Sequence, residues 1–214
     1  MRQTQVLDKV KVSRMSGKLK GIESINTNPL TNMFCKRMCK NKNIICGQCY
    51  AIYMLKTFRQ YCAPAFEYNS KLLSAKLLKP QQLPTFNSLY VRIHSYGELI
   101  NRTHYENIKL IAKYNHSVRF VLWSKRKDII RSKKSRPNNL WVIYSEPKLN
   151  QIKLVIPPGF DKVFANYTKE FIDKNKRIKM NCTGECMNCL HCYNRSTKLI
   201  RELVKKDKAK IKRG

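Results

Sequence analysis

Apolar runs and helical patterns alternate along most of the chain. The short runs that fit β-strands cover 21–27, 88–94, 117–123, 139–145, 152–156, 162–166 and 176–180. Between them, residues 102–114 have helical periodicity, and residues 125–134 suggest a shorter, basic helix. Strands that alternate with helices are typical of parallel βαβ units, so the pattern predicts an α/β fold.

A longer helical pattern runs through residues 47–76. Ala51, Leu55, Phe58 and Cys62 follow one another there at the i, i+4, i+7 and i+11 spacing of a single helix face. This face is expected to point into the core. Cys62 is therefore predicted to be a small core residue rather than a metal ligand.

The length of the chain, 214 residues, suits one α/β domain with a small appendage. We expect a basic arm over 1–20, the main domain over 21–180, a cysteine loop over 181–194 and a basic helix or tail over 195–214. No apolar run approaches the roughly 20 residues of a membrane span, and the N-terminus lacks the apolar stretch of a secretory signal. We therefore expect a cytoplasmic protein without membrane contact.

Lys and Arg outnumber Asp and Glu by 44 to 13, which gives a formal net charge of +31. This far exceeds the roughly 2–8 units that keep a small domain soluble. A polyanion would relieve the self-repulsion, and nucleic acid is the usual one, with residues 125–136 and 195–213 as its contacts. An AT-rich genome that favours Lys codons, and solvated basic surfaces, are the alternatives.

Eight of the nine cysteines form two clusters, which indicates metal binding rather than disulfides in a cytoplasmic protein. The first cluster is Cys35-x3-Cys39-x6-Cys46-x2-Cys49, and the second is Cys182-x3-Cys186-x2-Cys189-x2-Cys192. Thiolates select zinc, copper(I) or iron–sulfur clusters. Each cluster could hold zinc alone, or the two could combine as the knuckles of a zinc ribbon. The compact second spacing is closer to that of a ferredoxin loop.

Three neighbours of these cysteines are given structural roles. His191 is expected to be a solvent-facing loop residue rather than an extra ligand, and Tyr50 and Tyr193 are expected to pack beside the metal loops.

Polar residues follow the predicted strands, where parallel α/β folds place their reactive groups. We expect them to meet on one rim with the first cysteine cluster. The candidates for catalysis are His94, Lys125 and Glu146, and those for cofactor binding are Gly97, Glu98, Ser124, Ser145 and Asn166.

The chain resembles the phage gene-product-eighty-eight family in four segments: NMFCKRMCKNKNIICGQCYA, VRIHSYGEL, RFVLWSKRKDII and NLWVIYSEP. The C-x6-C-x2-C-Y-A pattern from Cys39 to Ala51 is also similar to that of the three-Cys-motif phage proteins, which look like radical S-adenosylmethionine enzymes. The resemblance covers roughly residues 16–195.

This resemblance implies a partial (β/α) barrel with cysteine-rich metal loops. Cys39, Cys46 and Cys49 would hold a [4Fe–4S] cluster, with Cys35 as an alternative fourth ligand. Gly97 and Glu98 would bind the amino group of S-adenosylmethionine. The second cysteine cluster would hold an auxiliary cluster or a zinc staple, and the open side of the barrel would admit nucleic acid or a protein. A phage origin would place the protein in the host cytoplasm.

Three functions follow. The leading one is a radical-type iron–sulfur protein that acts on or binds nucleic acid. The second is a zinc-stapled, non-catalytic nucleic-acid-binding protein. The third is a cluster-bearing regulator or partner protein without turnover. The sequence does not indicate the oligomeric state.

Overall fold

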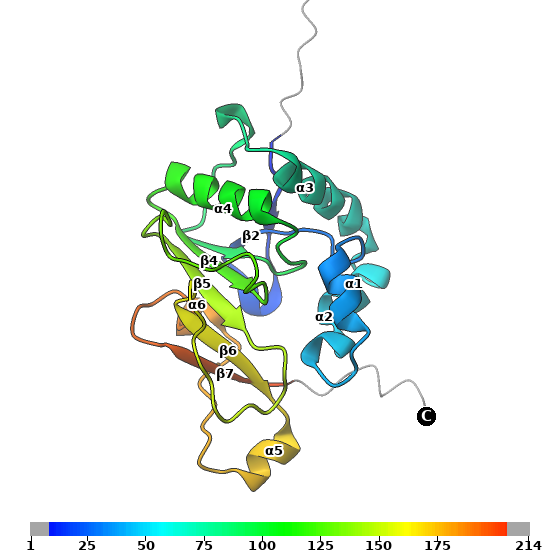
Figure 1. Cartoon of the computed structure of the whole chain (residues 1–214), viewed down its shortest axis with the longest axis vertical. Coiled ribbons are helices and arrows are strands. Elements are labelled where there is room, and N and C mark those ends of the chain that lie inside the picture. Colours follow the sequence, from blue (N-terminus) through cyan, green and yellow to red (C-terminus); the bar gives the residue numbers. More distant parts are fainter. Residues whose placement is uncertain (1–8, 205–214) are drawn as a thin grey trace, which may run out of the picture.

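The computed structural model describes residues 9–204 (Figure 1). The strands are β1 (Val12–Arg14), β2 (Glu23–Ile25), β3 (Tyr90–Ile93), β4 (Arg119–Ser124), β5 (Leu140–Ser145), β6 (Lys162–Tyr167) and β7 (Leu199–Leu203). The α-helices are α1 (Met33–Cys39), α2 (Tyr50–Lys56), α3 (Ala63–Ala75), α4 (Arg102–Tyr114), α5 (Lys169–Lys174) and α6 (Cys186–Cys189). Four 3-10 helices complete it: η1 (Gly17–Leu19), η2 (Ile45–Gln48), η3 (Gln60–Cys62) and η4 (Pro80–Gln82).

The strands form one seven-stranded sheet in which they follow one another in chain order. β1 pairs with β2 in the antiparallel sense, and every later neighbour pair is parallel. The predicted α/β fold is therefore confirmed. The strand order never reverses, so the sheet lacks the switch point of a doubly wound fold.

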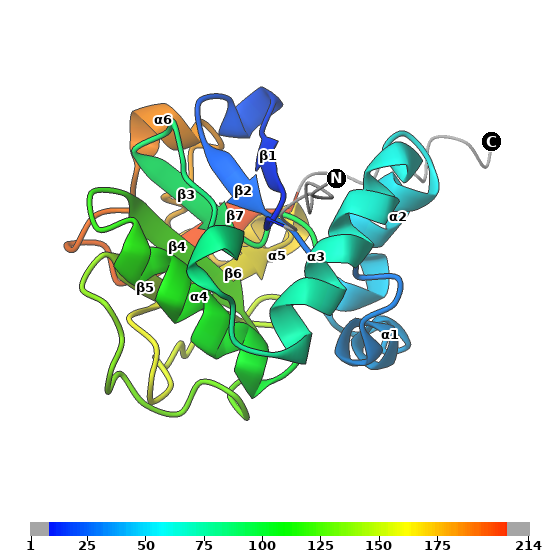
Figure 2. The same cartoon turned by 90° about the horizontal axis from the view of Figure 1, so that it is seen from above.

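Alternating side chains of the strands divide the core between the two faces of the sheet. On β4, Phe120 and Leu122 join the larger core cluster with Ile108 and Ile111 of α4. Figure 2 shows α3 and α4 lying together along this side of the sheet. Asn101 begins α4 by accepting a hydrogen bond from the backbone N–H of His104 (2.9 Å), so the predicted helix at 102–114 has its expected bounds.

The opposite face of the sheet is covered by the second cysteine loop. Val121 and Trp123 of β4 point to this side and pack with Tyr193 and Ile200, while Leu19 of η1 closes the cluster. Cys182, Cys186 and Cys192 border the same cluster as half-buried residues.

Some expected elements are absent from the described part of the chain. Residues 125–134 form turns instead of a basic helix, because Arg126 binds the carbonyls of Leu99 and Ile100 and Ile130 inserts into the core. Residues 152–156 are not a strand, since β5 pairs directly with β6. Residues 176–180 are not a strand either, because β7 takes the place beside β6.

The two ends of the chain differ from the expectation where they are described. Residues 9–20 are no free arm: β1 joins the sheet, and the backbone of Lys11 exchanges two hydrogen bonds of 2.8 Å with the Asn69 side chain. The expected C-terminal helix begins instead as the strand β7, whose Ile200 is buried against the second face. The rest of the basic tail, 205–214, and residues 1–8 lie outside the described residues.

The helical stretch over 47–76 is broken into α2, η3 and α3. Pro64 starts α3 in its first turn, and Thr57, in a non-helical conformation, ends α2. Phe58 is consequently exposed instead of buried. Cys62 does pack against the cluster of Leu55, Phe66 and Tyr96, as a half-buried residue. Within 9–204, no helix has the length and apolar character to cross a bilayer.

Candidate metal centres and cofactor site

The first cysteine cluster is attached to the strand that ends beside it. After β2, the Asn26 side chain accepts hydrogen bonds from the backbone N–H groups of Ser95 (2.9 Å) and Tyr96 (3.0 Å), which follow β3. Asn32 caps α1 and donates from its amide to the carbonyl of Glu98 (3.0 Å). The ends of β2 and β3 are thus joined before α1 presents the first two cysteines.

The spacer between Cys39 and Cys46 folds back on itself and reaches across to β5. The N–H of Ile45 donates to the carbonyl of Pro147 (2.9 Å), just beyond the end of β5. A Cβ on Gly47 would lie 2.5 Å from the carbonyl oxygen of Asn41, so only glycine fits this fold-back. The six-residue spacer therefore returns Cys46 and Cys49 toward α1.

The four thiols of the first cluster influence one another. Burial raises the pKa of Cys35, of Cys46 and of Cys39, the last to about 12, and the neighbouring thiols raise the pKa of Cys35 and Cys39 further. Lys125 opposes this effect at Cys39 and Cys46. The donor set fits a metal that prefers thiolates, since a bound cation would displace these protons.

These thiols lie near one another without converging. Among residues 9–204, no three His, Cys, Asp or Glu side chains take up an arrangement that would itself hold a metal ion. The fit to a metal therefore rests on the donor chemistry and on the place of the loop.

Glu98 is a buried carboxylate beside this cluster. It accepts hydrogen bonds from the Ser124 hydroxyl (2.6 Å) and from the backbone N–H groups of Lys125 and Leu99 (both 2.8 Å). Burial raises the pKa of Glu98, and the positive charge of Lys125 opposes that shift. Burial and, to a smaller extent, the charge of this carboxylate raise the pKa of Cys35.

Lys125 connects the ends of β4 and β5. Its ammonium group donates to the Ser145 hydroxyl (2.9 Å). Its positive charge lowers the pKa of Glu98, of Cys39 and of Cys46, against the effect of burial. The structure therefore brings Glu98, Ser124, Lys125 and Ser145 together at the carboxyl edge of the sheet, as predicted. We call these residues and the first cysteine cluster the strand-end site.

Two other candidates form hydrogen bonds of their own near the ends of β5 and β6. Glu146 is half-exposed and accepts a hydrogen bond from the backbone N–H of Lys148 (3.1 Å). Together with burial, its charge raises the pKa of Tyr144. Asn166 lies near the end of β6, and its carbonyl accepts from the backbone N–H of Asn150 (3.0 Å). These hydrogen bonds do not involve Glu98, Ser124, Lys125 or Ser145.

His94 does not join the rim either. It is buried, and its Nε2 lies 3.3 Å from Nε2 of His104 on α4. Burial lowers the pKa of His94 well below its usual value and that of His104 to about 3. The imidazole therefore belongs to a neutral pair in the core.

Gly97 positions Glu98 by its backbone. Its φ of +95° is in the region that favours glycine, and an added Cβ would lie 2.2 Å from the Thr27 hydroxyl oxygen. Thr27 also donates from that hydroxyl to the carbonyl of Glu98 (3.3 Å). Close packing of these two loops therefore requires glycine at this position.

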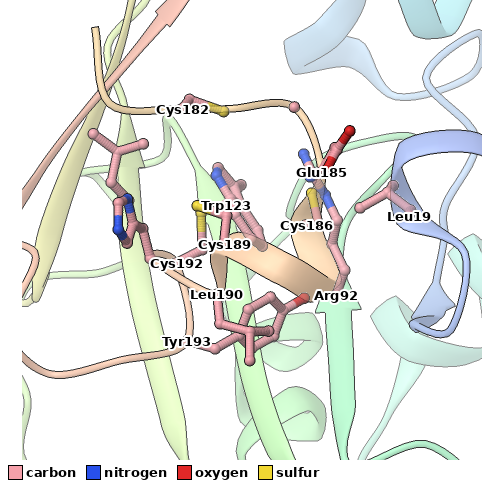
Figure 3. A pocket seen from close by; sticks show the side chains of 13 residues that line it. Leu19, Arg92, Trp123, Cys182, Glu185, Cys186, Cys189, Leu190, Cys192 and Tyr193 are labelled. Carbon is pink, nitrogen blue, oxygen red and sulfur yellow. The ribbon is translucent and has the colours of Figure 1, made fainter. Parts of the chain in front are cut away.

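The second cysteine cluster surrounds a small pocket on the face of the sheet opposite α3 and α4 (Figure 3). Its four cysteines line a cavity of about 20 Å³ together with Arg92 and Trp123. The guanidinium of Arg92 lies over the Trp123 ring at 4.0 Å. Figures 1 and 2 place α6 and α1 on different sides of the molecule, so the idea of one shared zinc ribbon is wrong.

Positive charges lie around the second cluster. Burial raises the pKa of Cys182, of Cys186 and of Cys192, the last to about 12. Arg92 opposes this effect at Cys186 and Cys192, and Lys18 opposes it at Cys182 and Cys186. These cations favour thiolates at this site, as metal binding would require.

A buried lysine fastens the second loop to the sheet. Lys162 of β6 donates to the carbonyls of His191 (2.8 Å) and Asn194, and burial lowers its pKa to about 8. His191 is half-buried rather than solvent-facing, with Nδ1 at 3.0 Å from the Asn181 carbonyl oxygen. Tyr193 packs beside the loop as predicted, with its ring 6.3 Å from that of Trp123, whereas Tyr50 is mostly exposed.

Arg92 and Lys162 were missed as site residues. Each is a charged residue inside an otherwise apolar strand, and a charge inside a parallel strand is rare because both faces are covered. That pattern is the signal that could have identified them.

Comparisons of the chain with protein-family models, with curated proteins and with solved structures return no match.

Substitution of Gly97 by Ala tests how the loop before Glu98 is held. We expect Gly97→Ala to lower the free energy of unfolding by about 2 kcal/mol more than Gly17→Ala does. Gly17 is the matched control because its φ is also positive, at +60°, but nothing lies within 4 Å of an added Cβ. Urea denaturation measures both, and equal losses would show that Thr27 does not restrict this position.

The buried histidine pair predicts sensitivity to acid. Both imidazoles have folded pKa values below the ordinary 6.5, that of His104 at about 3, so the unfolded chain takes up protons first as the pH falls. The stability that this pair contributes is complete above about pH 6.5 and is lost toward pH 3. Between pH 7 and pH 5, His104 alone should cost about 2 kcal/mol of unfolding free energy.

Urea denaturation at the two pH values checks this loss. The variant His104→Asn should lose less stability on acidification than the wild type does, by about that amount. His116→Gln, at an exposed histidine, should behave as the wild type does. An equal pH dependence in all three proteins would contradict the assignment.

Proposed function

We propose that this protein is an iron–sulfur protein of the radical S-adenosylmethionine type that acts on or binds nucleic acid. The observation that carries the proposal is the strand-end site, in which Asn32 caps α1, the helix of Cys35 and Cys39, and bonds to the carbonyl of Glu98 (3.0 Å), while Lys125 bonds to both Glu98 and Ser145. Reactive groups of barrel-type α/β enzymes come from this end of the strands.

The strand order supports a partial (β/α) barrel. Parallel strands in strict chain order, as from β2 to β7, are the arrangement from which such barrels are built, whereas doubly wound sheets reverse their order. We propose that the sheet curves in this way and that its open side admits a large substrate. The net charge of +31 supports nucleic acid as that substrate.

Cys39, Cys46 and Cys49 would hold a [4Fe–4S] cluster, with Cys35 beside them. When bound, such a cluster supplies the electron for one-electron cleavage of the sulfonium of S-adenosylmethionine. Glu98 would receive the amino group of that cofactor, because a carboxylate held by fixed donors in a buried position binds a cation strongly.

The second cluster is proposed to hold zinc. A cavity of about 20 Å³ is enough for roughly one water-sized group, which suits a single ion better than a four-iron cluster. This observation also favours the second candidate function, a zinc-stapled protein that binds nucleic acid without turnover. Metal analysis after anaerobic purification separates the two: iron with sulfide supports the first, and zinc alone supports the second.

The iron ligands are tested by removing one thiol from each environment. We expect Cys46→Ala, prepared anaerobically, to lose the bound iron and its visible absorption, because three thiolates are needed to retain the cluster. Cys62→Ala is the matched control, since this half-buried thiol packs against Leu55 and Phe66 outside both clusters. Unchanged iron in Cys46→Ala would refute the ligand assignment.

The role of Glu98 is tested by removing its charge. We expect Glu98→Gln to keep its iron but to bind S-adenosylmethionine at least tenfold more weakly, because a charge-assisted hydrogen bond contributes about 1.5–3 kcal/mol. Glu106→Gln is the matched control, at a partly exposed carboxylate of α4 that pairs with Lys109 (2.8 Å). Calorimetric titration measures the affinities, and equal affinity of both variants would remove Glu98 from cofactor binding.

A further inference from the structure

Four aromatic side chains stand exposed on α2, on the turn that follows it and on η3. The exposed fractions are 63% for Tyr50, 44% for Tyr53, 70% for Phe58 and 72% for Tyr61. Large aromatic side chains usually gain their free energy by burial, and a group of them at the surface marks an interaction site. We call these four residues the aromatic face.

The aromatic face lies in a segment without any negative charge. No Asp or Glu occurs between Glu23 and Glu67, and the residues between them include the basic residues Lys36, Arg37, Lys40, Lys42, Lys56 and Arg59. Lys56, which is exposed, lies between Tyr53 and Phe58 in the sequence, and Arg59 directly follows Phe58. The partner of this surface is therefore expected to be an anion with flat apolar groups.

The rings are held on a fixed support. Leu55 is buried beneath α2 in the cluster with Phe66 and Tyr96, which anchors the helix. The rings of Tyr53 and Phe58 meet edge to face at 6.3 Å, and those of Tyr50 and Tyr96 lie 6.2 Å apart. A partner would therefore meet three rings, those of Tyr50, Tyr53 and Phe58, that already pack against other rings, which lowers the entropic cost of binding.

We propose that the aromatic face binds single-stranded nucleic acid. The proposal deepens the proposed function by naming the form of its nucleic-acid partner, and it rests on that function. Unpaired bases offer the flat faces on which tyrosine and phenylalanine stack, whereas a duplex hides them between neighbouring base pairs. Lys56, whose side chain is exposed, contacts a phosphate, while Arg59 adds positive charge from its place beside Ser16 (3.0 Å).

The position of the face relates it to the strand-end site. Tyr50 directly follows Cys49, and its ring neighbours that of Tyr96, which precedes Gly97 and Glu98. A nucleic-acid strand stacked on Tyr50 therefore lies next to Cys49 of the first cysteine cluster. A second copy of the chain is a poor occupant, since two such basic segments would repel each other.

Binding of labelled oligonucleotides to the full-length protein tests the proposal. In fluorescence anisotropy titrations, Phe58→Ala and Tyr61→Ala should each weaken binding of a single strand by about tenfold, while binding of a duplex stays unchanged. Tyr114→Ala is the matched control, because this tyrosine of α4 is 54% exposed but lies outside the aromatic face. Lys56→Gln should reduce the salt dependence by about one counterion.

Two results would overturn the proposal: single-strand affinities of Phe58→Ala and Tyr61→Ala equal to that of Tyr114→Ala, or the same loss for single strand and duplex. Light scattering supplies a third, if the wild type is a dimer that these variants dissociate while they still bind the single strand as before. Iron content and cofactor binding are measured on the same samples. If Phe58→Ala and Tyr61→Ala weaken single-strand binding but the wild type contains no iron, the aromatic face is supported and only the proposed iron–sulfur chemistry is refuted.

Discussion

The buried carboxylate of Glu98 is the group on which the organisation of the strand-end site depends. A buried charge is tolerated only when donors satisfy it, and here Ser124 and two backbone N–H groups do so. These donors come from the ends of β3 and β4, while Asn32 and Thr27 fix the backbone of Glu98 from the side of β2. Through its carboxylate and its backbone carbonyl, Glu98 thereby joins three strand ends to the loop that presents the thiols.

The two faces of the sheet are stabilised in different ways. One is covered by α3 and α4 through ordinary apolar packing. The other is covered by a loop with little regular structure, which depends on Lys162, on the stacked Arg92 and Trp123, and on its four cysteines. We infer that a metal at these cysteines would replace the packing that a helix supplies on the other side.

The sequence predicted the central parallel strands and the helix α4 well, and the loops between them less well. The strands at β3 to β6 and the helix α4 were expected because their apolar periodicity is strong and agrees with their burial. The strand predicted at 152–156 was wrong, because an apolar run does not reveal whether a neighbouring strand is available to pair with it. The rule that parallel strands end at one edge of a sheet correctly predicted that Glu98, Ser124, Lys125 and Ser145 lie together. It was wrong for His94, whose side chain lies in the core beside His104, a partner that the sequence pattern does not reveal.

The attachment of the second cysteine loop bears on how the protein is assembled. This loop covers Val121 and Trp123 in the middle of the sheet, so its ordering belongs to the formation of the core itself. The first loop instead reaches over the sheet edge and meets β5 through the Pro147 carbonyl. If both loops bind metal, the second must be loaded while the chain folds, and the first can be filled afterwards by a donor that recognises the finished domain. A form with a complete sheet that lacks only the metal of the first loop would then be an intermediate of maturation rather than a damaged protein.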